Sequence, residues 1–402
     1  MATGKALNGK PYAGNPHVRF DEGEVASAAT PRRGSLLYNM VKKLVCGVAF
    51  AAVALGTASA WATDYTWNTG ADGDWEEPSN WSPSTGYPSA ADDTATIPNP
   101  VNSEGAGSAF TVTVNSPFSI AALSVAGTAG HEGKATLLFK TGFSTNAVSG
   151  DITLGNHATI THFGPNTTRA HAVVLRAGGD ITIAAGASVN VEQKGYAFVT
   201  KKNGYGPGVG RDNGRYGGEA RSGTYAVGKV HGSMRHPVDY GGSVWWTGAN
   251  SAGAVHFIAG GTLTLNGSIV ANGTGGSTCG SAGGSVWIEC AEFAGTGSIR
   301  AIGGVGSQDY SGSGGRIAIR QTATSGWTSF TGSYTTAHGT TASAAGGTLY
   351  LEDASDTPGE GTLIVDNSNN TRGNCKTSLE RGFVIGVWAR DEPAMQNIDG
   401  CG

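Results

Sequence analysis

The chain has 402 residues, of which 66 are glycine and only 14% are charged, with a formal net charge of −4. This charge excludes the basic excess that a nucleic-acid-binding surface needs, and no run of Lys and Arg with interleaved aromatics occurs. Because 39% of the residues are hydrophobic and helical periodicity is scarce, the composition predicts a folded, loop-rich, all-β protein.

A secretory signal peptide is predicted at residues 40–62. It has a positively charged start (40–43), an apolar run (44–56) that is too short to span a bilayer, and two overlapping A-x-A cleavage sites. We therefore expect cleavage after Ala60 or Ala62, export from a bacterial cell to its surface or surroundings, and no membrane span in the mature chain.

Residues 1–39 precede this signal and are predicted to be a disordered leader that is non-native or wrongly assigned. The stretch GKPYAGNPHVRFDEG (9–23) resembles the peptide obtained when the 3′ end of a bacterial group II intron is translated. The resemblance covers the leader alone and implies nothing about function.

Residues 63–109 are predicted to form a Trp-rich N-terminal capping unit. This unit resembles short segments near the N-termini of bacterial surface and autotransporter-type passenger proteins, through Trp67, Gly70, Trp75, Asn80, Trp81, Pro88 and Asp92. The favoured interpretation is that its aromatic side chains cover the open end of a β structure. The alternative is a glycan-stacking platform made of Trp67, Trp75 and Trp81.

Short alternating strands recur over residues 110–370. Five copies share a glycine-led apolar-x-apolar strand, a turn and a second such strand, and they begin at Gly150, Gly179, Gly261, Gly284 and Gly347. The strand GRIAI at Gly315 is a sixth first half. Since one unit cannot bury its apolar face alone, we predict stacking into a right-handed parallel β-helix (β-solenoid) with glycine-rich loop excursions.

The repeats predict two sets of equivalent, inward-facing positions. The first set is Ile152, Ile181, Leu263, Val286 and Leu349, and the second is Leu154, Ile183, Leu265, Ile288 and Leu351. Residues between them should face outward, where Trp287 and Tyr350 would be partly exposed or covered by a loop.

The repeat lapses at residues 196–253, which are predicted to form a glycine-rich insertion whose Tyr and Arg residues provide contact surface. The stretch from 179 to 319 resembles a glycine-rich repeat domain of large exported proteins of environmental bacteria, through GDITIAAGASVNV, GYGPGVG, GGTLTLNGSIVANG and SAGGSVWIEC. The resemblance implies a surface location and a repetitive architecture more than an activity.

Four cysteines would remain after signal cleavage: Cys279, Cys290, Cys375 and Cys401. An even number in an exported chain permits disulfides, and three pairings are open. The simplest joins nearest neighbours, so a bridge between Cys279 and Cys290 is predicted. The C-terminal segment (371–402) shows no sorting motif or apolar anchor, and we expect that the natural product continues past it.

The common catalytic signatures G-x-S-x-G, H-E-x-x-H and C-x-x-C do not occur, and no catalytic, cofactor or metal residue is predicted. GGVGSQDYS (303–311) approaches a calcium-binding nonapeptide, but its Asp309 is displaced by one position and the motif is single. Asp151 and Asp180 occupy equivalent repeat positions and are interpreted as turn or cap formers rather than paired acids.

These observations predict a secreted or cell-surface structural and adhesive protein without catalytic activity. Its expected partners are extracellular polysaccharide or cell-surface components, and not nucleic acid. The alternative is a carbohydrate-active β-helix enzyme (a polysaccharide lyase or glycoside hydrolase) or a glycan-binding module, which only architectural analogy supports.

Overall fold

The computed structural model describes residues 62–100, 108–126, 133–198, 204–210, 214–220, 228–244, 249–306, 310–324, 326–339, 344–365 and 377. The leader, almost all of the signal peptide, Cys375, Cys401 and Asp309 lie outside these ranges. Within them the chain forms 24 strands and one 3-10 turn, Pro78–Asn80. No helix in this part of the chain is long and apolar enough to cross a membrane.

The strands form three eight-stranded sheets, which we call A, B and C. Sheet A contains, in spatial order, β19 (Glu292–Ala294), β16 (Thr262–Leu265), β13 (Ile181–Ile183), β10 (Ile152–Leu154), β7 (Ala122–Val125), β4 (Thr94–Ile97), β1 (Asp64–Trp67) and β3 (Trp81–Ser82). Sheet B contains β2 (Gly73–Asp74), β5 (Ala109–Val114), β8 (Lys134–Phe139), β11 (Ala158–His162), β14 (Ser188–Asn190), β17 (Ser268–Val270), β20 (Ser298–Arg300) and β22 (Ser333–Thr335). Sheet C contains β24 (Thr362–Ile364), β23 (Thr348–Glu352), β21 (Arg316–Gln321), β18 (Ser285–Cys290), β15 (Ala254–Ala259), β12 (Val173–Ala177), β9 (Asn146–Val148) and β6 (Ser119–Ile120).

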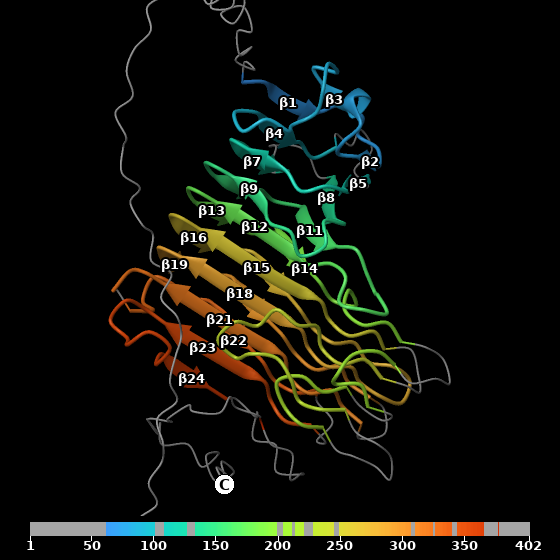
Figure 1. Cartoon of the computed structure of the whole chain (residues 1–402), viewed down its shortest axis with the longest axis vertical. Helices are drawn as coiled ribbons and strands as arrows, with labels where there is room; N and C mark the ends of the chain where they lie inside the picture. The colour runs from blue at the N-terminus through green and yellow to red at the C-terminus, as the bar shows by residue number, and fades with distance from the viewer. Residues whose placement is uncertain are drawn as a thin grey trace, which may run out of the picture. The chain divides into compact units, whose positions relative to one another are not determined.

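From β4 to β23, consecutive strands along the chain lie in different sheets, and neighbours within a sheet are mostly three strands apart in sequence (Figure 1). We call three consecutive strands, one per sheet, a layer. Pairing between layers is parallel, as in β10 with β13 and β13 with β16, whereas β1 with β3 and β23 with β24 are antiparallel. Alternating side chains of each strand meet in one continuous apolar core.

The predicted right-handed parallel β-helix, with the five paired segments as its coils, is wrong. Ile152, Ile181 and Leu263 are register partners in sheet A, but Val286 and Leu349 lie in sheet C. The sequence pattern of a glycine-led alternating strand is the same in all three sheets. The alternation indicates which face of the strand is buried, but it does not indicate which strand pairs with it. The fold class is therefore corrected to three mostly parallel eight-stranded sheets without an α-helix in the described ranges.

The predicted inward direction is confirmed for both sets of apolar positions. All ten side chains are buried, including those whose sheet was wrongly assigned. Burial follows from the alternation within each strand, so it does not depend on the sheet to which the strand belongs.

The described parts of the insertion lie against the loops that lead into sheet C. Here backbones pack directly on one another: Gly217 donates its amide hydrogen to Gly314 O at 3.0 Å. A Cβ on Gly314 would lie 1.8 Å from Thr336 O, and one on Gly208 would lie 1.8 Å from Arg215 O. Glycine is therefore required at these two positions for steric reasons.

Candidate binding site on the outer face of sheet C

Two rows of side chains project outward from sheet C. The first row crosses four neighbouring strands as His256, Trp287, Ala318 and Tyr350. The second row, two residues further along each strand, is Ile258, Glu289, Arg320 and Glu352. One row is thus largely aromatic and the other largely charged.

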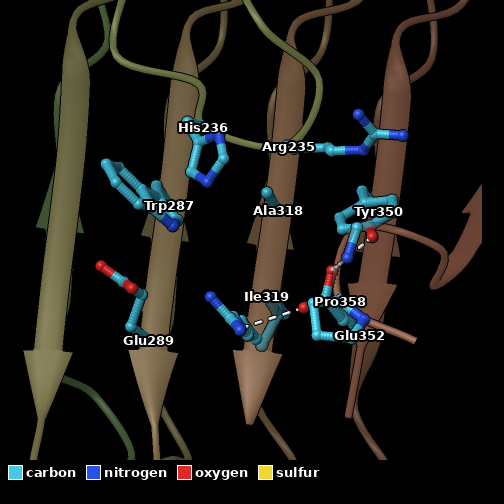
Figure 2. Close-up of a pocket in the computed structure, with 11 residues that line it drawn as sticks. Arg235, His236, Trp287, Glu289, Ala318, Ile319, Tyr350, Glu352 and Pro358 are labelled. Atoms are coloured by element: carbon cyan, nitrogen blue, oxygen red, sulfur yellow. Dashed lines mark hydrogen bonds and ion pairs between the residues drawn. The ribbon is translucent and has the colours of Figure 1, made fainter. Parts of the chain in front are cut away.

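Ala318 leaves a gap in the aromatic row, and a hollow of about 100 Å³ lies there. Trp287 and Tyr350 stand on either side of Ala318, while Arg235 and His236 approach from the insertion (Figure 2). Glu289, Arg320, Glu352 and the turn at Pro358 and Gly359 complete the lining.

Aromatic contacts fix the Trp287 side of the hollow. The His256 ring is parallel to the Trp287 ring at a centroid distance of 3.8 Å. His236 meets Trp287 edge-on at 5.1 Å. Trp287 is therefore held by one neighbour in the sheet and by one residue of the insertion.

A hydrogen bond and an ion pair organise the second row. His256 Nε2 lies 3.0 Å from Glu289 Oε1, and this contact is the main cause of a lowered pKa at the Glu289 carboxyl. Arg320 Nε lies 3.0 Å from Glu352 Oε1. Glu352 Oε2 also accepts hydrogen bonds from the Tyr350 hydroxyl at 2.5 Å and from the Gly359 amide at 2.9 Å.

The Glu352 carboxylate is buried and has three donors, so it is a structural anchor for this side of the hollow. Tyr350 is itself only 3% exposed. Its pKa is raised to about 12, first by burial and then by the hydrogen bond to Glu352, so its hydroxyl stays protonated as a donor.

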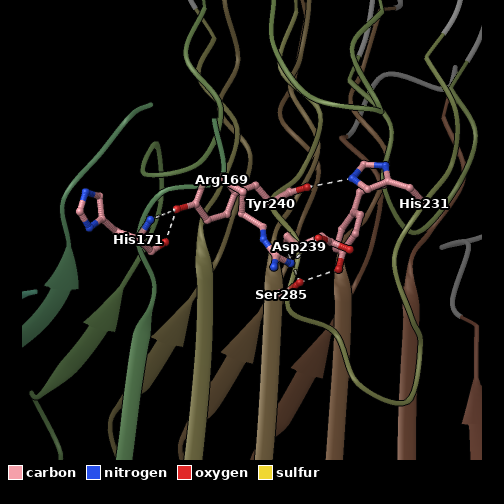
Figure 3. A network of polar contacts seen from close by, with 7 residues as sticks. Arg169, His171, His231, Asp239, Tyr240 and Ser285 are labelled. Carbon is pink, nitrogen blue, oxygen red and sulfur yellow. Dashed lines mark hydrogen bonds and ion pairs between the residues drawn. The ribbon is translucent and has the colours of Figure 1, made fainter. Parts of the chain in front are cut away.

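A network of polar contacts holds the insertion over sheet C (Figure 3). Arg169 Nη1 pairs with Asp239 Oδ1 at 2.6 Å. The Ser285 hydroxyl donates to Asp239 O at 2.6 Å, and the buried Tyr216 hydroxyl lies 2.5 Å from Ser285 Oγ.

Tyr240 extends this network toward β12. Its hydroxyl accepts from the His171 amide at 2.8 Å and donates to His171 O, and His231 Nε2 contacts Tyr240 O at 3.1 Å. Burial raises the pKa of Tyr240. We call the contacts of Asp239, Tyr240 and His231 the clamp. Because it fixes both ends of 231–240, it positions Arg235 and His236 above the sheet.

The three predicted glycan-stacking residues lie in the core of the N-terminal unit. Trp67, Trp75 and Trp81 are 3%, 1% and 0% exposed. Trp75 Nε1 donates to Pro88 O at 3.0 Å, and Trp81 Nε1 donates to Trp75 O at 2.7 Å. Their rings pack edge-on against one another and are buried, so they have no open face for a sugar.

Cys279 and Cys290 lie in two separate hydrophobic clusters, and the structure forms no disulfide between them. Cys279 packs with Val244 and Ala249, whereas Cys290 belongs to the main core. Burial raises the pKa of the Cys290 thiol to about 12, which keeps this thiol protonated and unreactive at neutral pH.

Asp151 and Asp180 lie in adjacent layers, and each bonds the backbone of the next layer. Asp151 Oδ1 accepts from the Asp180 amide at 2.8 Å, and Asp180 Oδ1 accepts from the Thr262 amide at 2.7 Å. The prediction that they form local turns or caps is therefore wrong: each carboxylate links its own layer to the backbone of the next one, 29 or 82 residues further along the chain. No group of three or more potential metal ligands gathers in the described part of the chain, and Asp309 of the calcium-like motif falls outside it.

Sequence reasoning placed Trp287 and Tyr350 on the outer face but did not identify a site there. Glu289, Arg320 and Glu352 occupy the outward positions of strands recognised from the sequence, so alternation was the available signal. The sequence indicated only that arginines of the insertion provide contact surface, and not that Arg235 and His236 reach sheet C, because the clamp that positions them depends on contacts between distant segments.

No family model, no curated protein and no solved structure matches this chain.

Proposed function

We propose that this chain is an exported, non-catalytic structural and adhesive protein of the bacterial cell surface, which attaches to extracellular polysaccharide. The predicted signal peptide supports export. Continuous rows of hydroxyl groups on the outside of two sheets carry the adhesive part of the proposal.

One such row crosses sheet B. Its members are Thr111, Thr136, Thr159, Ser188, Ser268, Ser298 and Ser333, each the register partner of the next. A similar row crosses sheet A through Thr66, Thr96, Ser124, Thr153, Thr182 and Thr264.

Parallel strands set these hydroxyls about 4.8 Å apart, close enough for contact: Thr159 Oγ1 lies 3.3 Å from Ser188 Oγ. Each hydrogen bond from such a row to a sugar hydroxyl contributes little in water, but many along one polymer act together. A rigid stack that repeats hydroxyls at a fixed spacing therefore favours attachment to a polymer over binding of a small molecule.

Export is tested by expressing the full chain in a Gram-negative host and fractionating the cells. We expect protein outside the cytoplasm whose N-terminus, measured by mass spectrometry, is Trp61 or Thr63. Cytoplasmic protein that retains Met1 would contradict the export part of the proposal.

Adhesion is tested with microbeads coated with the exported protein under flow. We expect beads to be retained on polysaccharide-coated glass and released from bare glass. Beads coated with heat-unfolded protein are the control, and equal retention of folded and unfolded coats would contradict adhesion by the folded surface.

A further inference from the structure

We propose that the hollow over Ala318 binds one pyranose unit of a neutral polysaccharide, by recognising two adjacent hydroxyl groups. This inference rests on the proposed function and names its specific contact site.

The steric part of the site follows from register. Trp287 and Tyr350 occupy the same row two strands apart, so their backbones are separated by about 9.6 Å. The intervening Ala318 fills little of this space and leaves a hollow of about 100 Å³. It therefore accommodates one edge of a sugar ring, whose hydroxyls replace water between two aromatic side chains.

The polar part of the site is the pair Glu289 and Arg320, which are direct register partners on β18 and β21. Glu289 uses Oε1 for His256, and its other oxygen can accept from a sugar hydroxyl. Arg320 uses Nε for Glu352, and its terminal nitrogens can donate to the neighbouring hydroxyl. One acceptor beside one donor matches two adjacent hydroxyls of a pyranose.

The charge of the lining selects a neutral sugar. Two arginines, Arg235 and Arg320, face two carboxylates, Glu289 and Glu352. The carboxylate of an acidic sugar would meet Glu289, and the ammonium of an amino sugar would meet Arg235. Neither ionic ligand gains a net opposite charge from this lining.

The site is largely preorganised. Side-chain exposure is 33% at Glu289 and 52% at Arg320, so both are accessible, yet each is oriented by a partner. The clamp fixes the segment that carries His236. Binding a sugar therefore orders few additional side chains, which favours affinity.

Affinity electrophoresis of the exported full chain in gels containing galactomannan, mixed-linkage β-glucan or alginate tests the proposal. We expect retardation by at least one of the two neutral polymers and not by alginate. Ala318→Leu fills the hollow and should weaken binding about tenfold or more, and Glu289→Gln should weaken it about tenfold by removing a charged acceptor.

The matched control is Ala294→Leu, which adds the same bulk to an outward alanine of sheet A. It should bind like wild type, and the thermal midpoints of all variants should verify folding. If Ala318→Leu is folded and binds like Ala294→Leu, or if only alginate retards the wild type, the site assignment is wrong.

Bead adhesion separates the two proposals. A folded Ala318→Leu variant that keeps the wild-type affinity in the gel, while wild-type beads still adhere, would contradict the site and leave the proposed function standing. Wild-type beads that fail to adhere would contradict the proposed function itself.

Discussion

Sheets B and C share one core but present different outer surfaces. The outer face of sheet B carries its row of Ser and Thr side chains, of which Ser333 is exposed and the others are partly exposed. The outer face of sheet C carries aromatic and charged side chains, and the insertion covers part of it.

The comparison shows that the inward and outward positions of the sheets are under different constraints. Inward positions are apolar in both sheets, because each layer must bury them against the next. Outward positions have no such constraint, so one face can keep small hydroxyls while another assembles a hollow with Trp287 and Tyr350 as its walls.

The largest expected loss of stability comes from placing a charged side chain at a single inward position. Ile269→Asp in β17 would bury an unpaired charge in the core, and we expect it to unfold the surrounding layers. Its neighbour Ser268 points outward, so Ser268→Asp should fold normally. Circular dichroism and limited proteolysis measure both, and a folded Ile269→Asp would contradict the shared core.

Lowering the pH should destabilise the region where the insertion contacts β11. His162 is fully buried, its Nε2 faces the Ala254 amide at 3.3 Å, and burial lowers its pKa from 6.5 to about 3. Protonation of the His162 imidazole is therefore less favourable in the folded than in the unfolded state. The contribution of neutral His162 to the free energy of unfolding is fully present above pH 6.5 and is lost as the pH drops toward 3, by about 4 to 5 kcal/mol in all.

Denaturant titrations at pH 7, 5 and 4 measure this loss, with His162→Asn as the control that cannot become a cation. The variant is less stable at pH 7, but its stability should fall less between pH 7 and 4. Parallel pH curves for both proteins would show that His162 is not responsible.

Removing one hydroxyl of the clamp should have an intermediate effect. Tyr240→Phe loses both contacts with the His171 backbone inside a buried cluster and should cost about 1 to 3 kcal/mol. We expect faster hydrogen exchange in 231–240 and weaker polysaccharide binding, while sheet B exchanges as before. Tyr87→Phe in the N-terminal unit is the control and should leave exchange in 231–240 unchanged.

The smallest effect is expected on the outer face of sheet B. Ser268→Ala with Ser298→Ala removes two outward hydroxyls and should change stability by less than about 0.5 kcal/mol per site. Binding at the hollow should not change, whereas retention of beads under flow should decrease. A loss of affinity in the gel assay would mean that the two faces are not independent.

The fold could be predicted to the level of strands and their buried faces. The alternation in GDITL or GSVWI identifies a strand and its inward residues, and burial confirms them. The sheet assignment failed because β19 was missed. Its three residues contain a single buried apolar side chain, Phe293, and an alternating pattern this short does not identify a strand.

Without β19, the strand at Gly284 was paired with the strand at Gly297 as if they were successive parts of one unit. In the structure β18 ends one layer in sheet C, and β19 and β20 begin the next in sheets A and B. The site was hidden for a related reason. The insertion segment 231–240, which carries Arg235 and His236, is positioned by single side chains such as Asp239 and Tyr240, and no periodic sequence pattern predicts such contacts.

The pairing of layers has a consequence for how this chain can vary in length. The amide of Thr296 bonds Asn266 Oδ1 from a position 30 residues along the chain, which is the length of one compact layer. Between β14 and β15 the chain instead makes a detour through the whole insertion, yet β12 and β15 still pair residue for residue. The register between layers is therefore kept whether the connecting segment is short or contains the whole insertion.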